Sequence, residues 1–214
     1  MKRSTIALFI HQPRCSVQCA NGMIRALSPH YDFKIFTKHE IEDDFFDDVD
    51  LVAFPGGDGD ADSYDYLLKH HAQRIRNYVA DGGRYLGICM GAYWADTNYF
   101  GLLDSVRAVQ YITQPNTCTR RPHAKAMPVN WSGEQIKMYF YDGCALVGNT
   151  NKFETVATYS NGDPMAIIQG RVGLIGCHPE AEYNWYQLQS WMKKEWQGPM
   201  HSYLLDFVDN LMKK

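Results

Sequence analysis

The first hundred residues alternate between short apolar runs and segments with helical periodicity, and this alternation limits the fold most. The apolar runs predict four strands, at residues 4–10, 33–36, 51–54 and 84–88. Helical spacing predicts helices at residues 16–28, 64–80 and 91–98, and a helical turn or loop in the acidic stretch 40–50. Strands that alternate with helices favour a parallel sheet covered on both faces, so we expect an α/β protein.

The second half of the chain has a different pattern, with short β-branched or aromatic segments separated by turn signals. These segments predict mainly antiparallel strands inserted beside the sheet, the last of which rejoins it: 108–112, 124–130, 136–141, 153–159, 164–169 and 172–177. The tail, residues 181–213, is expected to be helical with a break near Gly198 and Pro199. No linker-like stretch separates halves, so a single domain over residues 1–214 is expected.

Composition narrows the class of protein. Hydrophobic residues make up 45% of the chain and the formal net charge is -3, which lacks the basic excess of nucleic-acid-binding proteins. The apolar run at residues 6–10 is shorter than the roughly 7–15 residues of a signal-peptide core, and none reaches the ~20 residues of a membrane span. We therefore expect a cytoplasmic protein with no nucleic-acid and no membrane partner.

The cysteine pattern argues against structural disulfides and metal centres. The chain has six cysteines but is too long to need disulfides in place of a hydrophobic core. Their spacing matches no structural zinc site, so we expect reduced thiols, no metal and no cofactor. Cys15 and Cys19 are expected to pack as small apolar residues; the alternative is a redox pair, if Cys15 approaches Cys89.

Cys89 is the strongest candidate for chemistry, because it follows the predicted strand at 84–88 directly and begins a predicted helix. Gly87 and Gly91 leave room for a sharp strand-to-helix turn, the nucleophile elbow that exposes a reactive side chain. The start of a helix also favours a thiolate over a thiol. The alternative is a buried cysteine in a glycine-rich turn that packs against the helix.

A base for this thiol is predicted where the last strand ends. His178 follows the strand at 172–177 and precedes Pro179, which favours an extended conformation at His178. Glu180 then points to the same side and can hydrogen-bond one nitrogen of the imidazole. This predicts a catalytic triad of Cys89, His178 and Glu180. The alternative is a strand-end histidine that packs against a loop.

The remaining site residues are predicted from the carboxyl ends of the strands, where ligands bind in parallel sheets. The backbone N–H groups of Gly57 and Met90 are the candidates for an oxyanion hole, because glycine tolerates unusual conformations and Met90 follows the nucleophile. The alternative for the loop at Gly57 is a plain turn.

Five further residues are predicted to bind substrate. Gly56 and Asp58 belong to the polar loop after the third strand, and Tyr93 follows the elbow. Arg120 and Arg121 are expected to bind an anionic group, since guanidinium groups suit carboxylates, or else to belong to a solvated loop.

Three motifs together resemble the class I glutamine amidotransferase-like superfamily: Phe-Pro-Gly-Gly at 54–57, Gly-Ile-Cys-Met-Gly at 87–91 and His-Pro-Glu at 178–180. Within it, residues 82–95 look like the N-terminal domain of eukaryotic biotin–protein ligases, and the similarity spans about residues 5–185. The resemblance implies a flavodoxin-like three-layer sandwich and a Cys-His-Glu triad. It does not extend to the catalytic domain that ligates biotin.

The expected function is a thiol-dependent hydrolase or an acyl- or amidotransferase-like protein that acts on a small-molecule or peptide-like substrate. Glutamine is not the favoured substrate, because Tyr93 stands where glutamine amidotransferases usually carry a glutamine. Two alternatives stay open: a thiol sensor, as in the related DJ-1-like branch, and a non-catalytic interaction domain. Aromatic residues of the C-terminal region are candidates for a partner or homodimer surface: Tyr183, Trp185, Tyr186, Trp191, Trp196 and Tyr203.

Overall fold

The structure is a computed structural model that describes residues 2–42, 44–187 and 190–214. Its strands are β1 (Thr5–Phe9), β2 (Asp32–Phe36), β3 (Leu51–Phe54), β4 (Arg84–Ile88), β5 (Val106–Gln110), β6 (Lys125–Trp131), β7 (Glu134–Phe140), β8 (Cys144–Gly148), β9 (Glu154–Tyr159), β10 (Pro164–Gln169) and β11 (Val172–Ile175). Its α-helices are α1 (Val17–Leu27), α2 (Tyr64–Leu67), α3 (Ala72–Ala80), α4 (Met90–Trp94), α5 (Tyr183–Gln187) and α6 (His201–Met212).

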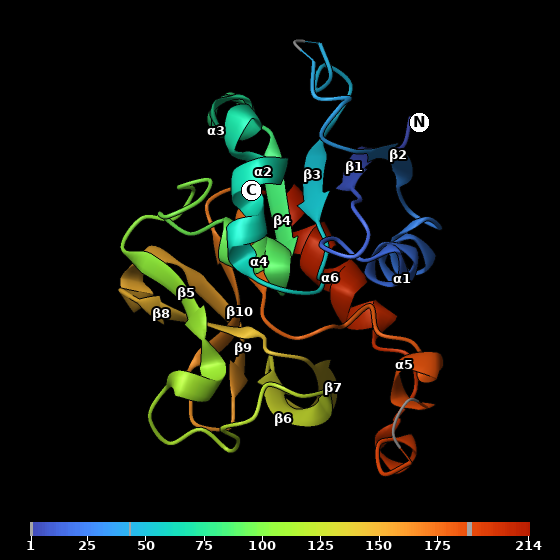
Figure 1. Cartoon of the computed structure of the whole chain (residues 1–214), viewed down its shortest axis with the longest axis vertical. Helices are drawn as coiled ribbons and strands as arrows, with labels where there is room; N and C mark the ends of the chain where they lie inside the picture. Colours follow the sequence, from blue (N-terminus) through green and yellow to red (C-terminus); the bar gives the residue numbers. More distant parts are fainter. Residues whose placement is uncertain (1, 43, 188–189) are drawn as a thin grey trace.

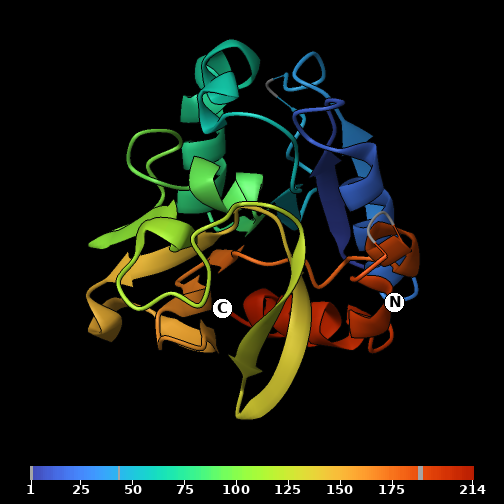
Figure 2. The same cartoon turned by 60° about the horizontal axis from the view of Figure 1, so that its bottom comes forward.

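A nine-stranded sheet, in the order β2-β1-β3-β4-β11-β10-β9-β6-β7, runs through the molecule (Figure 1). The pairs from β2 to β11 are parallel, and the pairs from β11 to β7 are antiparallel. The predicted α/β fold with a mostly parallel core is thus confirmed, and β11 rejoins the sheet as expected. Strands β5 and β8 form a separate antiparallel pair, and Figure 2 shows the β6–β7 hairpin reaching away from the rest.

Helices cover both faces of the parallel part, because its strands bury side chains on both sides. In β1, Ile6 and Leu8 pack into the core beneath α1 and α6, whereas Ala7 and Phe9 pack beneath α2, α3 and α4. The alternation follows from the two-residue repeat of a strand, and burial on both faces explains why the run is continuously apolar. Figure 1 shows the resulting three layers of helix, sheet and helix.

Two of the predicted helices are interrupted in the structure. The segment 64–80 is interrupted at Leu68, whose φ of -132° separates α2 from a 3₁₀ turn at Lys69–His71 and from α3. The buried residues keep helical spacing across this break, which is why the sequence does not reveal it. In the tail, only α5 and α6 are α-helical, with a 3₁₀ turn at Lys193–Glu195; residues 188–189 lie outside the described residues. The expected break is present, because α6 begins only after Gly198 and Pro199.

One strand is missing from the prediction and several are placed differently. Strand β8 was not predicted because Cys144, Ala145 and Leu146 are all buried and give no alternation. The strands expected beside the sheet instead extend it, since β10 pairs directly with β11 and continues through β9 to β6 and β7.

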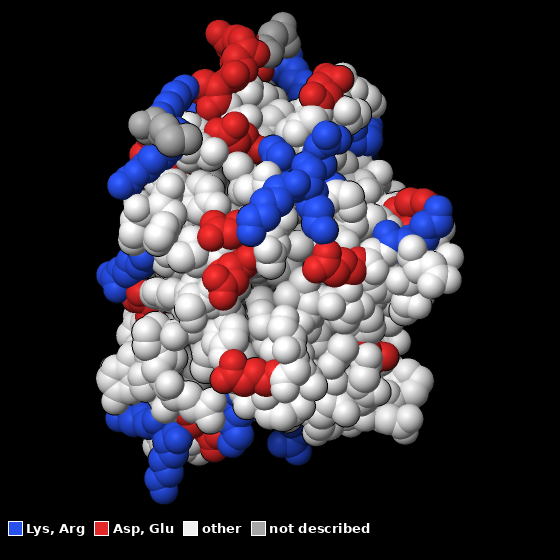
Figure 3. All heavy atoms as spheres, turned by 180° about the vertical axis from the view of Figure 1, so that it is seen from behind, with Lys and Arg blue, Asp and Glu red and all other residues white. Residues whose placement is uncertain are grey.

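The helices are short, and the surface carries charges of both signs. Within the described part of the chain, none of the helices has both the length and the apolar character needed to cross a membrane. On the face opposite that of Figure 1, basic and acidic side chains are interspersed (Figure 3).

Candidate active site

Cys89 lies between the end of β4 and the start of α4, in a strained backbone conformation. Its φ of 51° and ψ of -103° are unusual for a residue with a side chain. Glycine is required on both sides: a Cβ at Gly87 would lie 2.4 Å from the Gly91 oxygen, and one at Gly91 would lie 2.0 Å from the Phe54 oxygen. The sequence thus folds locally into the sharp turn predicted for a nucleophile.

The thiol of Cys89 borders a cleft of about 560 Å³. Only 6% of the residue is exposed, and the thiol donates to the carbonyl oxygen of Tyr141 at 3.6 Å. Helix α4 has five residues rather than the longer span predicted, so its dipole is weaker than expected. The remaining electrostatic effect of the helix is local, because the first N–H groups, at Met90 and Gly91, have no partner within the helix.

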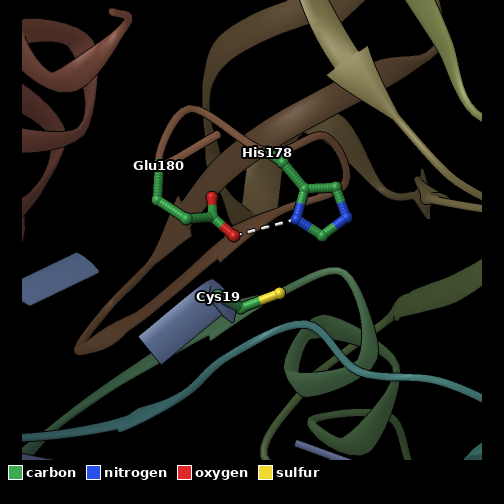
Figure 4. Close-up of side chains that lie close together, drawn as sticks. All are labelled: Cys19, His178 and Glu180. Atoms are coloured by element: carbon green, nitrogen blue, oxygen red, sulfur yellow. Dashed lines mark hydrogen bonds and ion pairs between the residues drawn. The ribbon is translucent and has the colours of Figure 1, made fainter. Parts of the chain in front are cut away.

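His178 and Glu180 form a buried hydrogen-bonded pair where the chain leaves β11. Nδ1 of His178 lies 2.8 Å from Oε1 of Glu180, and Figure 4 shows the carboxylate turned toward that nitrogen. His178 is 4% exposed and Glu180 0% exposed. The backbone N–H of His178 donates to the Tyr139 oxygen at 2.9 Å, which joins this loop to β7. The spacing of the two residues in an extended segment brings both side chains to one side, as the sequence indicates.

The electrostatic surroundings favour a protonated imidazole. Burial acts to lower the pKa of His178, but the Glu180 carboxylate and the neighbouring Cys89 and Cys19 sulfurs raise it well above the ordinary value. The protonated ring donates through Nδ1 to Glu180. His178 therefore connects Glu180 on one side with thiols on the other.

Cys19 was not predicted to belong to this group. It lies in the first turn of α1, which Ser16 caps by accepting from the Gln18 N–H at 3.1 Å. Its sulfur, a nitrogen of His178 and an oxygen of Glu180 all lie within 4.8 Å of one another (Figure 4). The signal available in the sequence is that α1 begins just after β1, at the same sheet edge as Cys89. All six cysteines are free thiols, and the buried Cys15 donates to the Pro55 oxygen at 3.7 Å.

The two residues predicted for an oxyanion hole, Gly57 and Met90, both line the Cys89 cleft. The neighbours of Gly57 are fixed, because the Gly56 oxygen accepts from the Ser16 N–H and the Asp58 N–H donates to the Pro13 oxygen. A Cβ at Gly57 would lie 1.5 Å from the Arg14 oxygen, so only glycine fits here.

Of the predicted substrate-binding residues in this region, only Tyr93 lines the Cys89 cleft; its hydroxyl donates to the Asp142 oxygen at 3.1 Å. Gly56 lies against the imidazole instead, since a Cβ there would be 2.5 Å from Cε1 of His178. Asp58 lines a second cleft, of about 360 Å³, together with Cys19 and His178. Gly57 and Tyr141 border both clefts and therefore stand between them.

Arg120 and Arg121 lie away from both clefts. Both are exposed, and neither is among the described residues that line the Cys89 cleft. The Arg120 guanidinium donates to the carbonyl oxygens of Ile112 and Gln114, at 2.9 and 2.7 Å. These hydrogen bonds stabilise the loop to which Arg120 belongs. Gly59, Asp60 and Ala61, from the polar loop after β3 that is expected at the site, also line the cleft. The lining residues outside the predicted segments are Tyr99, Gln110, Tyr141 and Asp142.

The aromatic C-terminal region is partly buried and partly exposed. Trp185 packs edge-on against His178, with ring centroids 5.6 Å apart, and Tyr186 packs against Tyr139. Trp185 and Tyr186 are buried, at 7% and 2% exposure, so neither belongs to an exposed surface. Tyr183 and Trp191 are exposed, at 47% and 52%. A partner or homodimer contact in this region stays a prediction.

Comparisons with known proteins find one family model and several solved structures that resemble this chain. The family model described as "Biotin-protein ligase, N terminal" matches residues 11–101. No curated protein matches the chain by sequence.

Solved structures match the whole chain by fold. A glutamine amidotransferase from Thermotoga maritima is 13% identical, with a TM-score of 0.67 over 100% of both chains. PurLQS from Thermotoga maritima is 16% identical, with a TM-score of 0.65 over 98% of this chain and 99% of that one. A glutamine amidotransferase from Methylobacillus flagellatus is 13% identical, with a TM-score of 0.56 over 100% of this chain and 90% of that one. Residues 11–101 thus resemble the biotin-protein ligase N-terminal family, and the chain has a fold similar to that of glutamine amidotransferases.

Proposed function

We propose that the protein is a thiol-dependent hydrolase or acyltransferase in which Cys89 is the nucleophile. The observation that carries this proposal is the strained Cys89 at the edge of a cleft, near a His178 whose Nδ1 is held by Glu180. Strain of this kind persists only where the surrounding structure enforces it, and it clusters at functional sites. A buried imidazole beside a thiol supports a thiolate, which is the reactive form.

The reaction would proceed through a thioester. The Cys89 thiolate attacks the carbonyl carbon of an amide or ester, and the N–H groups of Gly57 and Met90 donate to the oxyanion that forms. The His178 imidazolium gives its proton to the leaving amine or alcohol as the bond to carbon breaks. His178 then takes a proton from water, whose oxygen attacks the thioester and releases the acid; an amine or alcohol in place of water completes acyl transfer.

The lining of the cleft favours a neutral or cationic substrate over an anionic one. Asp60 and Asp142 contribute carboxylates, and no lysine or arginine is present among the described residues that line it. Oδ1 of Asp142 is buried without a hydrogen-bond partner in the described structure, whereas Oδ2 accepts from the Gln110 side chain at 2.9 Å. Three tyrosines in the lining add ring faces that attract cations. An amide or ester that carries an amino group suits this surface.

Acylation by an activated ester tests the proposal. The protein is mixed with p-nitrophenyl acetate, nitrophenolate release is followed, and the acetylated residue is located by mass spectrometry. We expect a burst of one nitrophenolate per chain and an acetyl group on Cys89, both lost in Cys89→Ser. The matched control, Cys118→Ser, removes an exposed thiol and should behave as wild type. Acetylation of the exposed Cys118 in place of Cys89, with no burst, would contradict the proposal and favour a non-catalytic interaction domain.

A further inference from the structure

Three buried side chains of different chemistry converge where Cys19 meets the pair of His178 and Glu180. Cys19 comes from α1, and His178 and Glu180 come from the loop after β11 (Figure 4). They offer sulfur, nitrogen and oxygen atoms that all lie within 4.8 Å of one another. Tetrahedral zinc takes such donors at about 2.0–2.3 Å, which places them roughly 3.5 Å apart. Movements of about 1 Å would therefore close the three donors around an ion.

The charges of the three groups match a divalent cation. Glu180 is fully buried, and its Oε2 has no hydrogen-bond partner within the described structure, so the carboxylate has binding capacity that His178 does not use. A thiolate at Cys19, the Glu180 carboxylate and a neutral His178 would balance the two positive charges of the ion. Buried charges are tolerated when they are compensated in this way.

The second cleft gives an ion access to these donors. Cys19 and His178 line this cleft of about 360 Å³ together with the polar side chains of Gln12, Gln18 and Asp58. Gly57 and Tyr141 stand between it and the cleft at Cys89. An ion can thus reach Cys19 and His178 from the second cleft.

We propose that Cys19, His178 and Glu180 form a reversible site for a thiophilic divalent cation, foremost zinc, and that its occupation inactivates Cys89. Binding breaks the hydrogen bond between His178 and Glu180 and forms bonds from the metal to sulfur, nitrogen and oxygen. The Cys19 thiol and the imidazolium each lose a proton to solvent. With one ring nitrogen bound to the metal and the proton on the other, the neutral His178 can no longer accept a proton from the Cys89 thiol. The inactivation rests on the proposed function, whereas the binding site does not.

Cobalt(II) in place of zinc tests the binding site directly. The reduced protein is titrated with Co²⁺, and the cobalt–thiolate absorption band is recorded; Zn²⁺ affinity is measured by competition with a chromogenic chelator. We expect one ion per chain in wild type, in Cys89→Ser and in the control Cys118→Ser. In Cys19→Ser we expect no thiolate band and at least a tenfold loss of zinc affinity, and Glu180→Gln should also weaken binding. Circular dichroism confirms that each variant is folded.

The pattern across variants decides the proposal. If Cys19→Ser keeps the band and Cys89→Ser loses it, the ion lies between Cys89 and His178, and the assignment to Cys19 is wrong. The absence of any band in wild type overturns it as well.

Iodoacetamide alkylation of Cys89, with and without zinc, tests the inactivation. Zinc should slow alkylation at least tenfold in wild type, EDTA should restore the rate, and Cys19→Ser should show no zinc effect. If wild-type protein binds the metal but Cys89 is alkylated at the same rate with and without zinc, the proposed inactivation is wrong. Slow alkylation of Cys89 even without zinc would instead contradict the proposed function. The cobalt titration alone would then decide whether the metal site exists.

Discussion

The position of His178 depends on the absence of a side chain at Gly56, and Gly56→Ala tests this dependence. A Cβ at Gly56 would lie 2.5 Å from Cε1 of His178 and 3.2 Å from the Cys19 sulfur. Ordinary van der Waals contact begins at 3.4 Å, so the imidazole would have to retreat by about 0.9 Å. Glu180 and the rings of Tyr139 and Trp185 hold the imidazole from other sides, so this movement distorts the contact with Cys89.

The expected size of the effect follows from this displacement. A shift of about 1 Å in a catalytic group can cost about 10²-fold in rate. We therefore expect Cys89 in Gly56→Ala to react with iodoacetamide about 10²-fold more slowly than in wild type. Overpacking of this kind should also cost about 1–3 kcal/mol of unfolding free energy, which is not enough to unfold a domain of ordinary stability.

The assay is timed alkylation followed by mass spectrometry of the Cys89 peptide, with urea unfolding measured in parallel. Gly170→Ala is the matched control, because it adds a methyl group at a positive φ of 54° where nothing lies within 4 Å. The control should lose about 1–2 kcal/mol through backbone strain and keep the wild-type alkylation rate. A wild-type rate in folded Gly56→Ala would show that the imidazole is not held in place as described, or that Cys89 does not depend on it.

Three other substitutions have defined outcomes. In Glu180→Gln, NMR titration should give a lower pKa for His178, because the carboxylate that raises this pKa is gone. In wild type, protonated His178 makes its full contribution to the free energy of unfolding below about pH 6.5. This contribution is lost as the pH rises through the higher pKa of His178 in the folded state. Asp96→Ala should lose about 2–3 kcal/mol in urea unfolding, because the buried carboxylate accepts from Arg107 and from the Ala108 N–H. Burial acts to raise the pKa of Asp96, but these hydrogen bonds lower it overall. The wild type should therefore lose this part of its unfolding free energy in acid, as the pH falls through the lowered pKa. Asp96→Ala should show no such loss, because it has no carboxylate at this position. Asp142→Asn should raise KM for a cationic thioester or ester about tenfold and leave a neutral one unchanged, as measured by steady-state kinetics.

The sequence was sufficient to predict the elements that depend on local order. Strand β4, the turn at Cys89 and the pair of His178 and Glu180 follow from an apolar run, two glycines and a proline. Parallel strands carry their carboxyl ends to one edge, which brings these segments together.

The features that the prediction missed depend on packing between distant segments. Cys19 reaches His178 only because α1 packs at a particular angle and Gly56 leaves space between them. Arg120 has the chemistry of an anion-binding group, but nothing in its neighbours shows that its guanidinium turns toward its own loop. The buried strand β8 shows no alternation, because both of its faces are covered.

The most direct test of the central claim compares Cys89 with Cys118 in one alkylation experiment. Cys118 is exposed, whereas Cys89 is 6% exposed, so accessibility alone would make Cys118 react first. Activation by His178 predicts the opposite order in wild type, and a return to the order set by accessibility in His178→Ala. Faster alkylation of Cys118 in wild type, or the same order in both proteins, would contradict the assignment of Cys89 as a nucleophile activated by His178.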